Sequence, residues 1–324
     1  MNTRGENGSS NLRATLTRLR RNIASVIQGK DQVIELVIAA VVARGHVLLE
    51  DVPGVGKTML AKSLARSIRA RFSRVQLTPD LLPSDITGTL IFNEQTSQFE
   101  LREGPVFTHI LLADELNRAT PRTQSSLLEA MEERQVSVDG RTYPLPQPFF
   151  VIATQNPVEQ EGVYPLPEAQ LDRFLMKLSL GYPAREDEFR IVKIRLNDEP
   201  FTKLEPVADV SDIIAAQEEC HDVYVDETVL SYALSVVEAT RRHPDIVLGA
   251  SPRATIALVT SAQAYAYVLG RTHVLPDDIK FLARPVLSHR LMLRPQAAIS
   301  GRTAEDIIGE ILQEVPVPLT LEEV

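Results

Sequence analysis

Residues 51–58 of the chain, DVPGVGKT, decide its fold. They lie between a short apolar run, His46 to Leu49, and a segment whose apolar residues recur at helical spacing. Phosphate binding needs this order of strand, glycine loop and helix, because glycines let backbone N–H groups approach the phosphates and a helix N-terminus favours negative charge. We therefore expect Lys57 to reach the β- and γ-phosphates of a nucleotide and the Thr58 hydroxyl to bind Mg²⁺.

The expected nucleotide-binding loop departs from the usual pattern at one position. Asp51 stands where that pattern has a glycine. The alternative is a tight strand-to-helix turn that binds nothing, but such a turn needs neither Lys57 nor Thr58. The residues assigned to nucleotide binding are Asp51, Pro53, Gly54, Val55, Gly56, Lys57, Thr58 and Met59.

Further apolar runs on either side of this loop indicate a sheet. Short apolar runs alternate with helical stretches, which predicts a mostly parallel sheet covered on both faces, and hence an α/β core with five strands. An amphipathic helix over residues 12–26 precedes them. The five runs are 46–49, 74–77, 109–113, 149–154 and 175–180.

The chain after residue 183 has a different pattern. No convincing strand follows Gly181-Tyr182-Pro183, and several helix-start signals do, at Asp226, Ser251-Pro252, Pro276-Asp277 and Thr303. We expect an α/β nucleotide-binding domain with inserted hairpins over residues 1–182, and a smaller, all-helical lid domain over residues 183–324.

Composition excludes several classes of protein. The 324 residues are 44% hydrophobic and 24% charged, as in an ordinary globular protein. The net charge of −9 argues against a nucleic-acid partner, because nucleic acids are themselves negatively charged. The single cysteine, Cys220, cannot form an internal disulfide. The longest apolar run, Val33 to Ala43, contains Glu35 and is too short to cross a membrane. We expect a cytoplasmic protein without a membrane segment.

Two acids follow the apolar run that ends at Ala113. Asp114 and Glu115 would lie at the carboxyl end of a parallel strand, where ligands bind in such sheets. Asp114 is expected to support Mg²⁺ through water, and Glu115 to orient and deprotonate the attacking water. The alternative is a solvated acidic pair, which the phosphate loop upstream makes the weaker interpretation.

Asn156 follows the next predicted strand and would face the same edge. An amide can accept from water and donate to a phosphate, so Asn156 fits a sensor of the γ-phosphate. Local sequence alone leaves a second interpretation open, in which Asn156 is a loop residue ahead of Pro157.

Two β-hairpins flank the acidic strand. Residues 135–143 contain Asp139-Gly140, whose two residues both accept positive φ at a hairpin turn. Residues 89–92 and 99–101 flank a polar turn. We expect both hairpins to contact a substrate; the alternative is surface decoration.

Together these motifs resemble those of the AAA+ ATPases, and they are most similar to the MoxR family. In that family the position of Asp51 tolerates this residue. The motifs that carry the resemblance are DVPGVGKT at 51–58, GPVF at 104–107, ADELNRA at 113–119, ATQNP at 153–157, EGVYPLPEAQLDRF at 161–174 and SPRA at 251–254.

The resemblance implies a homo-hexameric ring with ATP between neighbouring subunits. Arg173 matches the arginine that reaches the neighbour's γ-phosphate, and Arg253 matches the second sensor. Without the resemblance, Arg173 could simply pair with Asp172 and Arg253 could be a helix-surface charge. We expect Arg253, at the start of a lid helix, to meet the γ-phosphate in its own subunit. Weaker assignments are Arg118 and Arg122 at the interface and Val26 to Gly29 over adenine.

The resulting hypothesis is a Mg²⁺-dependent ATP hydrolase that remodels or assembles protein partners. The resemblance further implies clients with von Willebrand A domains. The hairpins also fit the motor subunit of a metal chelatase, and a nucleic-acid motor is a third candidate. A nucleotide switch without hydrolysis disagrees with the complete set of Lys57, Asp114, Glu115, Asn156 and Arg173, and a GTPase would need an Asn-Lys-x-Asp stretch that the chain lacks.

Overall fold

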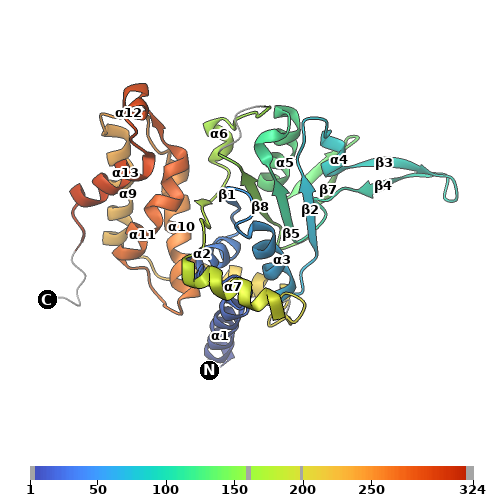
Figure 1. Ribbon diagram of the computed structural model, residues 1–324, viewed down its shortest axis with the longest axis horizontal. Helices are drawn as coiled ribbons and strands as arrows, with labels where there is room; N and C mark the ends of the chain where they lie inside the picture. Colours follow the sequence, from blue (N-terminus) through green and yellow to red (C-terminus); the bar gives the residue numbers. More distant parts are fainter. Residues whose placement is uncertain (1–3, 158–161, 198–199, 319–324) are drawn as a thin grey trace.

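The computed structural model describes residues 4–157, 162–197 and 200–318, so Glu161 of the motif at 161–174 lies outside it. A five-stranded sheet with the order β2-β5-β8-β1-β9 forms its centre (Figure 1). All neighbouring strands pair in parallel, which confirms the predicted α/β core. The strands are β1 (Val47–Glu50), β2 (Phe72–Gln76), β5 (Ile110–Asp114), β8 (Phe150–Gln155) and β9 (Met176–Leu178).

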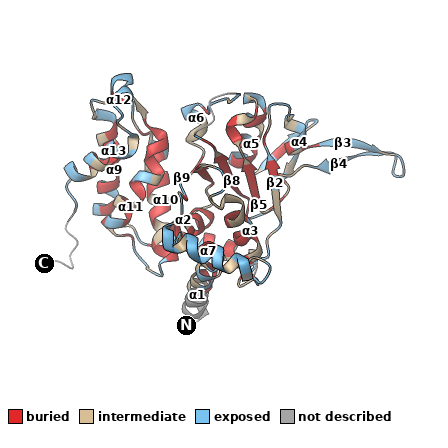
Figure 2. Cartoon of the chain, viewed as in Figure 1, coloured by how far each residue is buried: buried red, intermediate tan, exposed pale blue. Residues whose placement is uncertain are grey.

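Helices cover the sheet on both faces. Successive side chains of a strand point to opposite sides, so neighbouring residues of β1 belong to different apolar clusters. Val47 and Leu49 belong to one apolar cluster, together with the helices on that face. Leu48 belongs to a second cluster on the other face. The first cluster includes α1 (Arg4–Ala24), α2 (Asp31–Val42) and α3 (Lys57–Ser67), and the second includes α5 (Pro121–Glu133). Figure 2 shows the strands buried between these layers.

Both predicted hairpins are present. The turn of the second has φ of 53° at Asp139 and 76° at Gly140, as its sequence predicts. Figure 1 shows the first hairpin extending away from the body of the molecule, and Figure 2 shows it largely exposed. The elements are α4 (Pro83–Thr87), β3 (Gly88–Asn93) with β4 (Gln98–Glu103), and β6 (Gln135–Val138) with β7 (Arg141–Pro144).

The chain beyond residue 183 is helical, with one exception. A short antiparallel ribbon, β10 (Ile246–Leu248) with β11 (Met292–Leu293), corrects the expectation of no strand there. Strands of two or three residues are too short to show the alternation of apolar and polar residues by which a strand is predicted. The helices are α7 (Arg185–Asn197), α8 (Val210–Glu219), α9 (Glu227–Arg242), α10 (Pro252–Val268), α11 (Pro276–Leu287), α12 (Pro295–Ile299) and α13 (Ala304–Glu314).

The helical part shares its core with the sheet. Helix α10 packs on α2, and α11 packs beside β9. Buried side chains of α10 and α11 belong to the same apolar cluster as those of β1. The division of the chain at residue 182 stays a prediction. Among the described residues, no helix combines the length and the hydropathy that a membrane span requires.

Candidate active site

The phosphate loop joins β1 to α3 and presents the N-terminus of that helix. Gly54 has a φ of 88° and Gly56 a φ of 102°, conformations in which other residues are strained. Lys57 is the first residue of α3. Its ammonium donates to the carbonyl oxygens of Asp51 at 2.7 Å and Val52 at 3.3 Å. The loop thus combines backbone N–H groups, a helix N-terminus and a cation, which suits a polyphosphate.

The two predicted acids lie at the carboxyl end of β5, as expected. Thr154 of β8 connects them, since its hydroxyl donates to Asp114 Oδ1 at 2.6 Å and accepts from the Glu115 N–H at 2.9 Å. Arg74 of β2 binds the other oxygen of Asp114 at 2.7 Å. Three neighbouring strands therefore fix the position of the Asp114 carboxylate.

Glu115 has an unusual backbone for its residue type. Its φ of 57° lies in the left-handed region, where a non-glycine residue is uncommon and often marks a functional site. Its carboxylate forms an ion pair of 3.0 Å with Arg118 in the following 3₁₀ helix, Leu116–Arg118. Arg118, predicted as a weak interface residue, therefore contacts the predicted base within its own chain.

A pocket of about 380 Å³ at the carboxyl edge of the sheet brings together most of the predicted loop residues, the acidic pair and Asn156. Asn156, 7% exposed, lines the same pocket after β8. The pocket joins a phosphate-binding loop, a carboxylate that can orient water and an amide in one space. Its lining residues are Pro53, Gly54, Gly56, Lys57, Thr58, Met59, Arg74, Asp114, Glu115, Thr154, Asn156 and Arg195.

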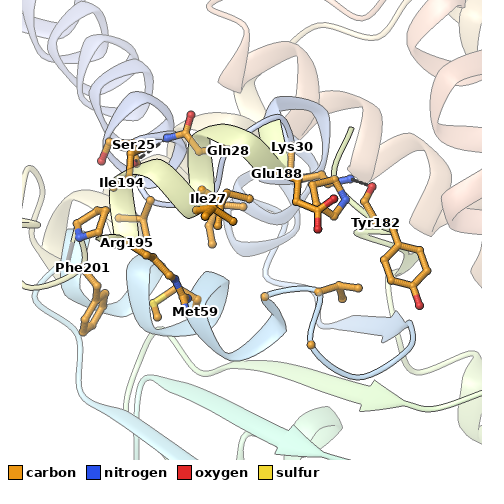
Figure 3. Close-up of a pocket in the computed structure, with 18 of the residues that line it drawn as sticks. Ser25, Ile27, Gln28, Lys30, Met59, Tyr182, Glu188, Ile194, Arg195 and Phe201 are labelled. Carbon is orange, nitrogen blue, oxygen red and sulfur yellow. Dashed lines mark hydrogen bonds between the residues drawn. The ribbon is translucent and has the colours of Figure 1, made fainter. Parts of the chain in front are cut away.

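A second pocket of about 900 Å³ continues from the other side of the phosphate loop (Figure 3). Its walls come from the turn between α1 and α2, from the loop and from α7. Ile27, Met59 and Phe201 give it apolar surface of the kind that a nucleobase needs, and Val55 lines it as well. The predicted adenine segment, Val26 to Gly29, contributes three of its four residues, Val26, Ile27 and Gln28.

Asp51 differs from the other expected loop residues. Its side chain is 5% exposed and points toward the end of β9, where it accepts hydrogen bonds from Ser179 Oγ at 2.7 Å, Leu180 N at 2.6 Å and Gly181 N at 2.9 Å. The carboxylate lines neither pocket. The carboxylate ties β1 to the segment after β9, and the assignment of Asp51 to nucleotide binding stays a prediction.

The donor set fits a magnesium ion that keeps water and phosphate ligands. Mg²⁺ is held in nucleotide sites by one or two protein oxygens, with waters and phosphates completing the octahedron. Thr58 and Asp114 supply such oxygens on the wall of one pocket. Within the described ranges, no group of three or more His, Cys, Asp or Glu side chains could hold a metal by itself.

The two predicted arginines lie at the opposite edge of the sheet. Arg173 follows α6 (Glu168–Leu171) and precedes β9, and the N–H of Leu175 donates to the His46 carbonyl just before β1. The phosphate loop follows the other end of β1. Arg173 binds Glu132 Oε2 at 3.2 Å and Arg253 binds Glu132 Oε1 at 2.9 Å.

This placement puts Arg253 away from the phosphate loop of its own subunit, and its contact with a nucleotide stays a prediction. Glu132 lies in the last turn of α5, next to Met131, whose carbonyl contacts the His46 ring at 3.0 Å. The amino end of β1 therefore lies beside both arginines, and neither lines the phosphate-loop pocket. Arg253 packs where α10 begins, against α5, because the carboxylate there gives it a counter-charge.

Three pocket residues escaped the sequence analysis. Arg74 lies on β2, two residues before the position paired with Asp114, so only the pairing of β2 with β5 reveals its contact. Thr154 ends the predicted strand over residues 149–154, so the sequence already placed it at the same strand end as Asn156. Arg195 of α7 lines both pockets, and no motif marks it.

Two family models match the chain. Residues 46–176 match the "ATPase family associated with various cellular activities (AAA)", and residues 238–311 match the "AAA lid domain". The first match contains the phosphate loop, the acidic pair, Asn156 and Arg173. The second contains Arg253.

Proteins of similar sequence and structure span nearly the whole chain. The protein YeaC of Bacillus subtilis, which is uncharacterised, is 52% identical over 95% of this chain and 96% of its own. The chaperone MoxR1 of Mycobacterium tuberculosis is 42% identical over 94% of this chain and 82% of its own. The crystal structure of a Cytophaga hutchinsonii protein assigned as an ATPase superposes with a TM-score of 0.90, at 39% identity, over 97% of this chain and 98% of that one.

Proposed function

Because the chain belongs to the MoxR family of AAA+ ATPases and hydrolyses ATP, we propose that it uses hydrolysis to remodel or assemble protein partners, as a chaperone. The active unit in this proposal is a ring of six identical subunits with a nucleotide at each interface. We also propose that the protein acts in the cytoplasm, where cysteines stay reduced, since its single cysteine gives no sign of a disulfide framework.

One observation supports the proposed ring of subunits. The phosphate loop, Glu115 and Asn156 share a pocket at the carboxyl edge of the sheet, whereas Arg173 and Arg253 lie at the amino edge. The length of β1 separates the two sets within a subunit. A neighbouring subunit that turns its amino edge toward this pocket would bring both arginines to the nucleotide.

The proposed chemistry follows from the groups around the pocket. Lys57 and the loop N–H groups hold the phosphates, and Glu115 orients water for attack on the γ-phosphate. Asn156 contacts the same phosphate. Mg²⁺, bound by Thr58 and through water by Asp114, would neutralise charge on the phosphates. Arg173 of the neighbour stabilises the charge of the transition state.

Contact with clients is assigned to the two hairpins. On the first, Phe92 and Phe99 are 53% and 63% exposed, and their rings stack edge to face at 5.3 Å. An exposed aromatic pair on a projecting ribbon is a suitable contact for a protein partner. Clients with von Willebrand A domains are part of the proposal, and rest on the family resemblance.

Mixing two inactive variants tests the ring. Arg173→Ala subunits should bind ATP and hydrolyse it poorly, while Lys57→Ala subunits should fail to bind it. Their mixture should recover activity, since the intact loop of one can meet the intact Arg173 of the other. Size measurements must show that mixed rings form. Mixed rings without any recovered activity would refute the role of Arg173 in the neighbour's site.

A trapped complex tests the client class. Glu115→Gln should hold ATP without turnover, so that a client stays bound and can be purified from native lysate. The matched protein carries Phe92→Ser in the same background and should lose that client. Recovery of metal chelatase subunits, or stimulation of ATP turnover by DNA, would replace the chaperone proposal with one of the two other motors.

A further inference from the structure

A buried arginine of the helical part binds the segment that carries Arg173. Arg290 ends the 3₁₀ helix Ser288–Arg290, which follows α11, and its side chain is 3% exposed. Its Nε donates to Asp172 Oδ1 at 2.6 Å. Its two Nη atoms donate to the backbone carbonyls of Asp172 at 3.2 Å, Phe174 at 2.7 Å and Leu175 at 3.2 Å.

The neighbouring His289 contacts the same segment of the chain. His289 is buried, and its Nε2 lies 3.0 Å from the Phe174 carbonyl oxygen. Burial, together with the adjacent Arg290 charge, holds the pKa of His289 well below its ordinary value. The imidazole is therefore neutral near pH 7 and adds no second charge to this interior.

These bonds fix the backbone on both sides of Arg173. A guanidinium carries five donors in a rigid planar fork, so bonds to several acceptors define one orientation of the segment that supplies them. The acceptors here lie on residues 172, 174 and 175. The Arg173 side chain leaves this segment toward Glu132 and is 29% exposed.

We propose that Arg290 is a positioning residue for Arg173, which it holds in place for the nucleotide of the neighbouring subunit. The inference rests on the proposed role of Arg173 in that neighbour's site. Arg290 and Arg253 both belong to the part of the chain after residue 183, and both contact the neighbourhood of Arg173. The position of these helices in one subunit thereby sets the rate of hydrolysis in the next.

Arg290→Lys tests the fork while keeping the positive charge beside Asp172. Without bound nucleotide, amide hydrogen exchange in a peptide covering residues 168–178 should become faster. Misplacement of a catalytic group by about 1 Å costs on the order of 100-fold in rate, so kcat should fall by about that factor. The Kd for an ATP analogue should stay unchanged, because the phosphate loop of the same subunit is intact.

Arg271→Lys is the matched control. Arg271 also forms a two-pronged pair with a buried carboxylate, Asp278, through bonds of 2.7 Å and 2.6 Å, and does not contact residues 172–175. It should lower thermal stability without changing exchange at residues 168–178. Equal effects of the two variants on exchange and kcat would reduce Arg290 to a general stabilising role.

Mixed rings separate this proposal from the one it rests on. Arg290→Lys mixed with Lys57→Ala should recover turnover, because the intact loop of the first receives a correctly held Arg173 from the second. If turnover recovers when Arg173→Ala is mixed with Lys57→Ala but not when Arg290→Lys is mixed with Lys57→Ala, the ring is supported and the positioning role of Arg290 is refuted. If neither mixture recovers turnover, the proposed role of Arg173 in the neighbour's site is itself refuted.

A second variant covers the case in which Arg290→Lys does not fold. Asp172→Asn removes the charged acceptor of Arg290 and leaves the three backbone acceptors in place. The same measurements apply, with faster exchange, a lower kcat and an unchanged Kd as the expected result. Unchanged exchange and kcat in a folded Asp172→Asn protein would overturn the inference.

Discussion

Arg118 Nη1 lies 3.0 Å from Oε2 of Glu115, so the predicted base is paired with a cation of its own chain. The two residues are three positions apart, on either side of the turn from β5 into the 3₁₀ helix. Glu115 keeps a left-handed backbone there, with a φ of 57°. Its carboxylate is thus held at the pocket wall by both its backbone and its partner.

Separate variants should divide nucleotide binding from hydrolysis. Lys57→Ala should lose binding of a fluorescent ATP analogue, because the cation at the start of α3 is gone. Glu115→Gln should keep that binding and lose at least about 100-fold in turnover, the usual contribution of a positioned base. Titration of the analogue and a phosphate-release assay measure the two effects. Full turnover by Glu115→Gln would remove the assignment of the base.

Arg253→Ala should act on the neighbour's site. The ratio of the ATP to ADP dissociation constants should be unchanged, because Arg253 does not line the pocket of its own chain. Turnover should fall, and mixing with Lys57→Ala subunits should restore part of it. Calorimetry in Mg²⁺ gives the ratio. A selective loss of ATP affinity in unmixed Arg253→Ala protein would return Arg253 to its own subunit's nucleotide.

Asp51→Asn should weaken the fold and spare nucleotide binding. The buried carboxylate accepts from two backbone N–H groups, of Leu180 and Gly181, and an amide can accept with one oxygen only. Urea unfolding should show a loss of about 2 kcal/mol. Asp51→Gly, which restores the common loop pattern, should be destabilised as well. Glu94→Gln on an exposed turn is the control, and equal effects of Glu94→Gln and Asp51→Asn would contradict the structural role.

Acid should destabilise the protein through His46. The His46 Nδ1 accepts from the Val151 N–H at 3.0 Å, so its Nε2 donates to the Met131 carbonyl and the ring is neutral. Burial lowers the pKa of His46 from 6.5 to about 4. A folded pKa below the unfolded one gives stability that is complete above pH 6.5 and is lost as the pH falls toward 4.

The size of this effect follows from the two pKa values. Between pH 7.5 and pH 5, His46 should account for a loss of about 2 kcal/mol in the free energy of unfolding. Urea titrations at both pH values measure it. The His46→Gln variant has no group to protonate at this position, so its pH dependence should be smaller by that amount. The same pH dependence in both proteins would show that His46 does not titrate as described.

The sheet and the phosphate loop could be predicted because their signals are local. A buried parallel strand is a continuous apolar run, and a phosphate loop is a few adjacent residues with special backbone needs. The β10–β11 ribbon had no comparable signal. Its strands are only three and two residues long, and Val247 and Leu248 are exposed, so neither burial nor period marks them.

The sequence by itself determined the parallel α/β core, the phosphate loop, the acidic pair after β5 and their chemistry, because each depends on residues adjacent in the chain. Only the tertiary structure decided which distant groups meet. The Asp51 carboxylate binds residues 179–181, and Arg253 binds the same Glu132 as Arg173, although Arg253 and Glu132 are 121 positions apart in the chain. A residue's type and neighbours specify the partner it can have, whereas packing of the helices against the sheet selects the one it reaches.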